Sequence, residues 1–311
     1  MKRVLLILLS LLAVIPLFAA THYFTNDYGK QEILLKLDKQ GQELKINLII
    51  SGLDEAYTGI YRNGIGTLVN SDSTETISIS FLERKHQLNI SKNGNEFILK
   101  EIALEFVQNR ELNRLSSVLK YPEFLLDSKF AHLVETHVAT YFDELESEFW
   151  QEGLNSMTTE PEYFIGYNIS LNAELELISP ELISLSYIDY RYTGGAHGNF
   201  KFSGFNYQWQ NNELKLISWE DIFASDYVKE ISDLVISKLS LLKAEAVLRG
   251  NRKDFTQEEL SYHSFNNIGM TFYFPPYMLD CYAAGDFKVL ISWDELGNYI
   301  KTDSPLQRFV N

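Results

Sequence analysis

The sequence predicts an α+β protein in which an antiparallel sheet is packed by two or three helices and is preceded by a small all-β meander domain. Three observations lead to this fold class. Residues 22–109 consist of short alternating apolar and polar runs separated by turn residues. Residues 126–149 carry one apolar stripe at three- and four-residue steps, and further alternating runs follow with shorter helical patterns between them. Strands first, followed by mixed strands and helices, are typical of this class.

Residues 1–20 have the plan of a secretory signal peptide. Two cationic residues precede an apolar run from Val4 to Phe18, and the small residues Ala19 and Ala20 follow. This order predicts cleavage near Ala19 or Ala20. Because the apolar run is shorter than the about 20 residues of a bilayer span, we expect a periplasmic or secreted product with no membrane span after cleavage. The alternative is a signal that is retained as an anchor.

Composition and charge bound the partners of the chain. Apolar residues make up 45% of it, which is typical of a globular protein. Cys281 is the only cysteine, so no internal disulfide can form, and we expect its thiol to be buried. Removal of residues 1–20 takes away two cations and no acids, which changes the formal net charge from −15 to −17. Such a surface repels nucleic acid and anionic polymers and attracts cationic partners.

Residues 21–110 are predicted to form the N-terminal β-meander domain. Turn pairs such as Asn63-Gly64 and Asn93-Gly94 separate its alternating runs, as in β-hairpins. The runs predicted to be strands are Gln42–Ile50, Tyr57–Val69, Thr76–Leu82, His86–Ile90 and Phe97–Phe106. We see no cluster of charged residues or histidines in this sequence segment and assign it no chemistry.

Residues 111–300 are predicted to form the α+β domain, with a first half over residues 111–190 and a second half over residues 191–300. The segment from Leu112 to Glu123 is interpreted as a connection. Residues 301–311 are predicted to be a short tail.

Within the α+β domain, helices and strands follow from periodicity. The stripe from Leu126 to Phe149 predicts the longest helix. A second helix is predicted over Val228–Leu242, and the capping-box spacing of Thr256 and Glu259 predicts the start of a short third helix. Alternating apolar residues predict two closing strands, Ile268–Phe274 and Phe287–Trp293.

The most distinctive local pattern is Tyr192–Asn199, YTGGAHGN, which lies between two aromatic-rich alternating runs. We interpret it as a shaped loop between two strands, since its three glycines allow positive φ values. The apolar residues on either side change parity near Tyr187-Ile188 and near Ser203-Gly204. A β-bulge produces a one-residue slip of this kind, so we predict bulges at both positions, level across the hairpin.

A second rigid segment, Pro275–Gly285, lies between the closing strands. Its double proline favours a preorganised turn, and its tyrosines are either contact aromatics or lids over the core. We expect this turn and the glycine loop to converge on one ligand-binding surface. The residues predicted for it are Tyr192, Gly194, Gly195, His197, Asn199, Pro276, Tyr277 and Tyr282.

The sequence contains no enzyme motif that we can identify. The zinc-protease helix, the phosphate-binding glycine loop and the serine elbow are missing. No pair among the six histidines has metal-ligand spacing, and we expect neither a metal nor a cofactor. His197 is the one weak candidate for catalysis, with Asp189 as the nearest carboxylate in the sequence. The simpler interpretation is that His197 bonds a loop carbonyl and holds the shape of the hairpin.

Several motifs in this order resemble the PdaC/RsiV-like family: YTGGAHGN, the SWEDIF turn at Ser218–Phe223, and FYFPPY…YAAGDFKVLISWDEL over Phe272–Leu296. The resemblance covers about Leu112 to Leu296. Members of this family are extracytoplasmic domains that occur beside peptidoglycan deacetylase catalytic domains and in anti-sigma factors whose outer part binds lysozyme. The resemblance therefore implies a fold and an extracytoplasmic binding role, and it does not imply deacetylation.

We thus expect an exported, non-catalytic binding module of the cell envelope. Its ligand would be a cell-wall glycan or another wall component, or a cationic wall-active protein such as lysozyme, and the negative charge favours the cationic protein. One alternative is a wall-sugar hydrolase or deacetylase that uses His197 with an acidic partner. Another is a purely structural envelope protein, in which the loop and the turn would be buried.

Overall fold

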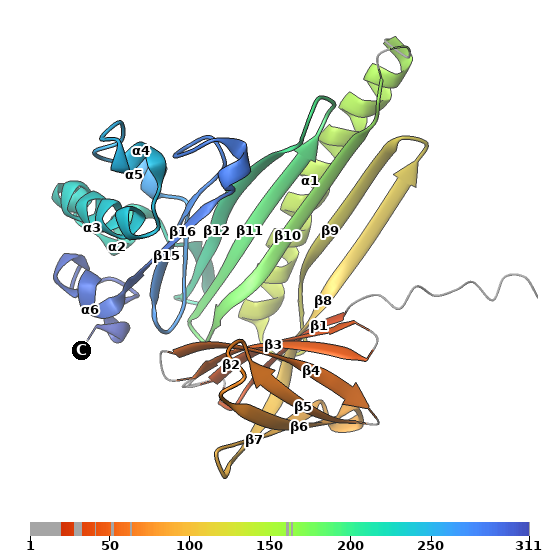
Figure 1. The fold of residues 1–311 in the computed structure, drawn as a ribbon, viewed down its shortest axis with the longest axis vertical. Helices are drawn as coiled ribbons and strands as arrows, with labels where there is room; N and C mark the ends of the chain where they lie inside the picture. The colour runs from red at the N-terminus through yellow and green to blue at the C-terminus, as the bar shows by residue number, and fades with distance from the viewer. Residues whose placement is uncertain are drawn as a thin grey trace, which may run out of the picture.

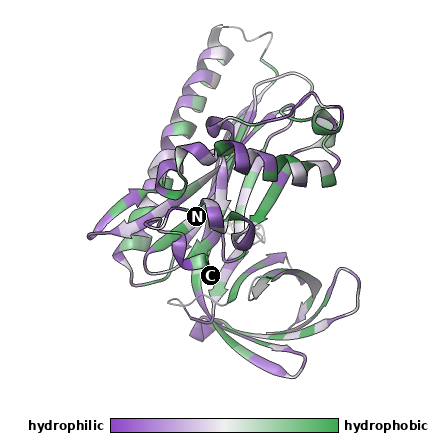
Figure 2. Ribbon diagram, turned by 90° about the vertical axis from the view of Figure 1, so that its left-hand side faces the viewer, coloured by the Kyte–Doolittle hydropathy of each residue, from purple (hydrophilic) through white to green (hydrophobic). Residues whose placement is uncertain are grey.

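The computed structural model describes residues 20–27, 33–40, 42–50, 53–62, 64–159, 162 and 164–310. The predicted signal peptide lies outside the described residues except for Ala20, and its cleavage stays a prediction. In both views a barrel lies at one end of the molecule, and helix α1 projects away from it (Figure 1 and Figure 2). Among the described residues, no helix combines the length and the apolar character needed to cross a bilayer.

The predicted meander is a closed, eight-stranded antiparallel barrel. Each strand pairs with the next along the chain, and β1 also pairs with β8, which closes the wall. Its strands are β1 (Ala20–Thr25), β2 (Ile33–Gln40), β3 (Glu43–Ile50), β4 (Leu53–Arg62), β5 (Ile65–Asn70), β6 (Thr76–Leu82), β7 (Gln87–Lys92) and β8 (Asn95–Leu112). Apolar side chains such as those of Phe24, Leu35, Ile46 and Leu68 fill the interior. The expectation of a simple meander was therefore incomplete, because it lacked β1, β2 and the closure.

The closing seam of the barrel contains a histidine–carboxylate cluster, contrary to the expectation that this segment has none. Glu101 on β8 is buried, and its two carboxylate oxygens lie 2.5 Å from His22 Nδ1 and 2.6 Å from His86 Nδ1. The three residues are separated by up to 79 positions in the chain. Pairing of β1 with β8 brings His22 to Glu101. His86, directly before β7, is held beside it by a backbone hydrogen bond from Glu101 N to His86 O at 2.8 Å. Local sequence patterns do not reveal the pairing of β1 with β8.

Strand β8 extends beyond the barrel and joins the second sheet. There it pairs with β9 (Leu115–Phe124), so the interpretation of Leu112–Glu123 as a connection was wrong. Leu115, Ser117 and Leu119 alternate inward in the manner of a strand. The division between domains at residues 110 and 111 remains a prediction, and β8 runs through it.

Helix α1 (Lys129–Thr159) connects β9 to its parallel neighbour β10 (Tyr167–Ile178). The sheet continues antiparallel through β11 (Leu182–Tyr192), β12 (Asn199–Gln210) and β13 (Glu213–Leu216). The predicted apolar stripe of α1 packs on one face of this sheet. Buried side chains of the contact include Val138, Phe142 and Phe149 from α1, and Leu171, Leu185 and Tyr207 from the strands.

A second, three-stranded sheet covers part of the opposite face, which corrects the expectation of one sheet packed only by helices. Its strands are β14 (His263–Phe265), β15 (Gly269–Phe274) and β16 (Phe287–Ser292). The remaining helices pack against it or border it: α2 (Trp219–Ile222), α3 (Val228–Leu241), α4 (Glu245–Leu248), α5 (Gln257–Leu260) and α6 (Trp293–Leu296). The predicted capping box is confirmed, because Thr256 and Glu259 exchange side-chain and backbone hydrogen bonds at the start of α5.

The predicted bulges between β11 and β12 are absent, since their register runs without a shift from Leu182–Gln208 to Arg191–Asn199. The apolar residues change parity for another reason: α1 covers one face of the strands and aromatic residues of the β15–β16 region cover the other. Gly204 lies where β14 crosses β12, and a β-carbon there would lie 1.8 Å from His263 O. The glycine therefore permits a close approach of two backbones and does not mark a bulge.

Candidate aromatic binding surface

The glycine hairpin and the proline turn meet through three side chains. The ring of His197, from the β11–β12 loop, stacks on Tyr282 with centroids 3.8 Å apart and planes inclined by 14°. His197 Nε2 lies 2.8 Å from the hydroxyl oxygen of Tyr277. The two tyrosines contact each other with centroids 5.7 Å apart. Two segments about 80 residues apart thus form one aromatic cluster, as the sequence predicted.

Backbone geometry shapes the hairpin. Gly194 and Gly195 have φ values of +104° and +93°, which explains why glycine occupies both positions. The hydroxyl of Tyr192 donates a hydrogen bond to Gly195 O at 3.1 Å across the loop. Gly198 is needed for another reason, because a β-carbon there would lie 2.4 Å from the ring of Tyr190.

The proline segment holds Tyr277 in an uncommon conformation. Met278 N donates to Pro275 O at 3.2 Å, which closes a four-residue turn with Pro276 at its second position. Tyr277, at the third position, has a φ of +71°, a value that this turn usually assigns to glycine or asparagine. The turn presents the tyrosine ring to solvent, where 59% of the residue is exposed. A bulky residue with positive φ costs about 1 kcal/mol or more, and such strain often marks a functional position.

Two further aromatic residues, which the sequence did not assign to the surface, extend the cluster along the sheet. Phe200 lies with its ring centroid 6.3 Å from that of Tyr282 and 4.8 Å from that of Tyr190, its partner across the β11–β12 ladder. Both residues are half-buried. Tyr190 and Phe200 form the second residue pair inward from the hairpin loop. Counting the strand pairs back from the loop would therefore have identified both residues in the sequence.

Among the residues that the structure describes, no carboxylate hydrogen-bonds to His197. Its Nδ1 lies 3.1 Å from Gly198 O, and its Nε2 faces Tyr277. Asp189 is buried and accepts three hydrogen bonds from Arg191 at 2.9 to 3.1 Å. Asp189 shares its strand parity with Tyr187, which faces α1, whereas the cluster lies on the other face of the sheet. The simpler interpretation of His197, that it holds the loop through a carbonyl, matches this contact.

The remaining predicted residues lie at the border of the cluster. Asn199 is exposed at the first position of β12, and Pro276 is half-buried beside Tyr277. Cys281, which we expected to be buried, is exposed, because it precedes a short 3₁₀ turn that carries Tyr282. Within the described part of the chain, no group of three or more His, Cys, Asp or Glu side chains is arranged to hold a metal ion.

Further along β11 and β12, the two sheets are joined by buried polar groups. Ser184 Oγ donates to Asn206 Oδ1 at 2.7 Å, and it accepts from Phe265 N at 3.0 Å. Asn206 Nδ2 donates to His263 O at 2.9 Å. Burial lowers the pKa of His263 to about 4, so this ring is neutral near neutral pH. The network fixes β14 on β11 and β12 and thereby holds the supporting sheet of the proline turn in place.

Two family models match adjacent segments of the chain. Residues 108–200 match the family model described as Deacetylase PdaC, and residues 220–294 match the model described as a protein of unknown function, DUF3298. These adjacent matches fit an envelope-associated domain of unknown function. The chain belongs to the PdaC/RsiV-like family, as the motifs indicated.

Two solved structures are similar to about two thirds of this chain. A DUF3298 family member from Bacteroides fragilis is 18% identical, with a TM-score of 0.42, and the match covers 65% of this chain and 93% of that one. A DUF3298 family protein from Pseudomonas aeruginosa PAO1 is 15% identical, with a TM-score of 0.43, over 64% of this chain and 94% of that one. No curated protein matches the sequence.

Proposed function

We propose that the chain is an exported binding module that recognises a cationic wall-active protein, such as lysozyme, through the aromatic cluster of His197, Tyr277 and Tyr282. The observation that carries this proposal is the convergence of two rigid segments on a group of rings in which Tyr277 is exposed and His197 and Tyr282 are half-buried. Tyrosine is among the residues that dominate binding energy at protein interfaces, and preorganised segments lose little entropy on binding.

The charge of the chain supports a cationic partner. The formal net charge is −15, or −17 without residues 1–20. A negative field raises the rate at which a cationic protein associates, and salt screens this effect. The exposure of Tyr277 favours a binding surface over a purely structural role, for which the loop and turn would be buried.

Binding of hen lysozyme to the wild-type chain and to Tyr277→Ala tests this proposal. We expect the substitution to weaken binding about 30-fold, corresponding to about 2 kcal/mol for an interface residue of this kind. Tyr262→Ala is the matched control, since Tyr262 is an exposed tyrosine outside the cluster. Absence of wild-type binding at low salt, or an equal loss in both variants, would refute a lysozyme-like partner at this site.

A wall glycan is the second candidate, and the stacked pair of His197 and Tyr282 favours it. Flat rings pack against the apolar faces of sugars, as amphipathic aromatic residues do in other binding sites. Isolated peptidoglycan should then bind the wild-type chain independently of salt. Loss of that binding in Tyr282→Ala, together with no affinity for lysozyme, would select the glycan.

A further inference from the structure

The outer wall of the barrel carries an uncharged surface over three neighbouring strands. All outward-facing side chains of β5, β6 and β7 are uncharged: Ile65, Thr67, Val69, Thr76, Ser78, Ser80, Leu82, Gln87, Asn89 and Ser91. We call this surface the neutral wall. It faces away from the α+β part, at the end of the molecule (Figure 1). A continuous surface of this kind contrasts with a chain in which 22% of residues are charged and acids exceed bases.

The neutral wall carries large exposed apolar side chains at its borders. Ile65 is 64% exposed and Ile98, on β8, is 63% exposed. Strand register places both in one row, since Ile65 pairs with Ser80, Ser80 with Asn89 and Asn89 with Ile98. Ile60, on β4, is 56% exposed in the adjacent row. Apolar side chains thus flank short polar ones, as in a surface that is covered by another sheet.

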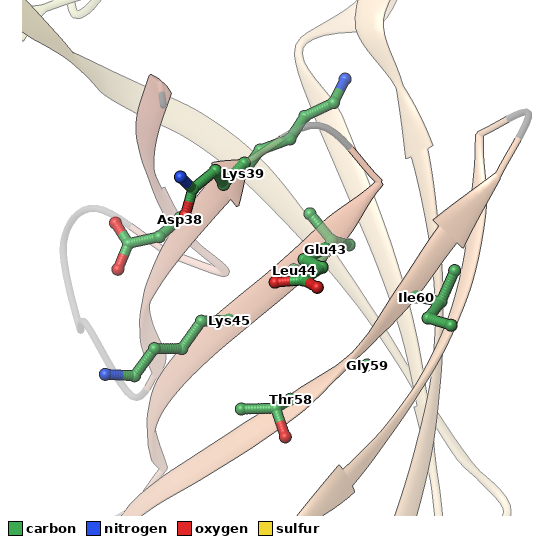
Figure 3. A pocket seen from close by; sticks show the side chains of 9 residues that line it. Asp38, Lys39, Glu43, Leu44, Lys45, Thr58, Gly59 and Ile60 are labelled. Carbon is green, nitrogen blue, oxygen red and sulfur yellow. The ribbon is translucent and has the colours of Figure 1, made fainter. Parts of the chain in front are cut away.

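The wall is hollowed where it meets β4. A β-carbon on Gly59 would lie 2.2 Å from Thr67 O, so β4 and β5 approach closely at this point. A hollow of about 470 Å³ lies over β2, β3 and β4 (Figure 3), and a second of about 500 Å³ over β4 and β5 shares Thr58, Gly59 and Ile60 with it. A protruding side chain of a partner therefore has room to insert beside Ile60.

Charged side chains of both signs border the hollows. Glu43 and Lys45 lie on β3, and Arg62 lies at the end of β4, all exposed to solvent. In a contact with two-fold symmetry, residue i of one copy meets residue j of the other and the reverse. A border with both acids and bases is complementary to itself under such symmetry.

We propose that the neutral wall is the contact between two copies of this chain, packed face to face about a two-fold axis. Two chains of net charge −15 repel each other over most of their surface, and the neutral wall lets them approach without like-charge contacts. Serine, threonine and asparagine side chains from the two walls can hydrogen-bond to one another, while Ile60 and Ile65 of each copy cover apolar area of the other. This contact is independent of the aromatic cluster, which lies on the α+β part.

Sedimentation equilibrium of the chain without its predicted signal peptide, at roughly 1 to 100 μM, tests the proposal. We expect a monomer–dimer equilibrium in the wild type. Ser78→Glu, at the centre of the wall, should raise the dissociation constant at least about tenfold, because it places like charges opposite each other. Ser78 is exposed, so the substitution leaves the barrel interior intact. An unchanged thermal unfolding curve at a concentration at which the wild type is monomeric verifies this, because dimer formation itself raises the unfolding temperature.

Leu241→Glu is the matched control. Leu241 is 76% exposed on α3, far from the barrel in the sequence, and its substitution should leave the dimer unchanged. A wild type that stays monomeric over the whole range would overturn the proposal, as would a dimer that Ser78→Glu does not weaken. Binding of a wall glycan that Ser78→Glu abolishes in a monomeric chain would assign the wall to another occupant and overturn it too.

Discussion

The barrel exposes an uncharged wall of regular strands to solvent, whereas the α+β part gathers one exposed and two half-buried rings at one loop and one turn. The wall is a product of strand alternation, because every second residue of β5, β6 and β7 faces outward. The ring cluster depends on special backbone positions, three glycines and a tyrosine with positive φ. A flat, regular wall can make a broad contact with a partner. A cluster with a strained residue such as Tyr277 is typical of a site that recognises a particular ligand.

The two regions also differ in the way they hold buried polar groups. The barrel contains a carboxylate between two histidines at its seam. The α+β part contains a neutral histidine and a serine–asparagine network at the crossing of two sheets. All four tryptophans follow residue 111, so their fluorescence reports on the α+β part alone, whereas circular dichroism reports on both.

Gly204→Ala should have the largest effect on stability. The new β-carbon would overlap His263 O, and both groups belong to backbone that cannot rotate away. We expect a loss of about 4 kcal/mol or more in the free energy of unfolding, since β14 must leave β12. Urea unfolding followed by tryptophan fluorescence measures this loss.

Gly195→Ala is the control for that experiment. Gly195 has a positive φ, but no atom lies within 4 Å of its added β-carbon. It should cost only about 1 kcal/mol, the usual penalty for the backbone conformation. Equal losses for the two variants would show that the crossing of β12 and β14 is looser than these contacts indicate.

The pH dependence of stability should begin in the α+β part. The folded pKa of His263 is about 4 and lies below its ordinary value of about 6.5, because burial disfavours the charged ring. The unfolded chain then binds more protons, so stability is fully present above about pH 6.5 and falls as pH drops towards 4. Integration over this range gives about 3 kcal/mol. Unfolding followed by tryptophan fluorescence between pH 7 and 4 measures it, and His263→Phe should remove this slope.

Glu101 at the barrel seam should act in a lower pH range and with a smaller effect. Burial raises the pKa of this carboxyl, but hydrogen bonds from His22 and His86 outweigh it and hold the folded pKa below the ordinary value. Its stabilisation is therefore present above the unfolded pKa of about 4.3 and is lost as pH falls through the folded value.

Glu101→Gln tests this assignment near neutral pH. It should cost about 2 kcal/mol, since two hydrogen bonds to a charged acceptor are weakened. Hydrogen exchange should quicken in β1 and β8 and stay unchanged in β11 and β14. Faster exchange confined to β11 and β14 would contradict the role of this cluster in barrel closure.

Sequence reasoning succeeded where the signal is local or lies in a motif. The glycines of the hairpin and the double proline predicted two shaped segments, and the structure joins them through His197 and Tyr277. Alternation predicted most strands of the barrel, and the three- and four-residue period predicted α1. These features depend on neighbours within a few residues.

The failures involve contacts between distant segments. Closure of the barrel pairs β1 with β8, and no local pattern of either strand reports its partner. The parity change near Tyr187 predicts a bulge that the structure does not contain, because the sequence does not show that rings such as Tyr273 cover the second face of the sheet. Asp189 is near His197 in the sequence but faces the opposite side, where Arg191 binds it.

Tyr277→Asn should have the smallest effect on stability, and it distinguishes a role of Tyr277 in folding from a role in ligand binding. Asparagine tolerates positive φ better than tyrosine, so Tyr277→Asn should stabilise the fold by about 0.5 kcal/mol. It removes the exposed ring and the hydroxyl that contacts His197, so the same variant should lose lysozyme or glycan binding. Tyr282→Asn is the matched comparison: it removes the ring that stacks on His197 without relieving a positive φ, and it should lose binding without any gain in stability.

Thermal unfolding and ligand titration of the two variants show whether Tyr277 serves binding or packing. Because tyrosine at position 277 weakens the fold, a gain in stability with a loss of binding would mean that this residue serves recognition, whereas lower stability in both variants would mean that it serves packing.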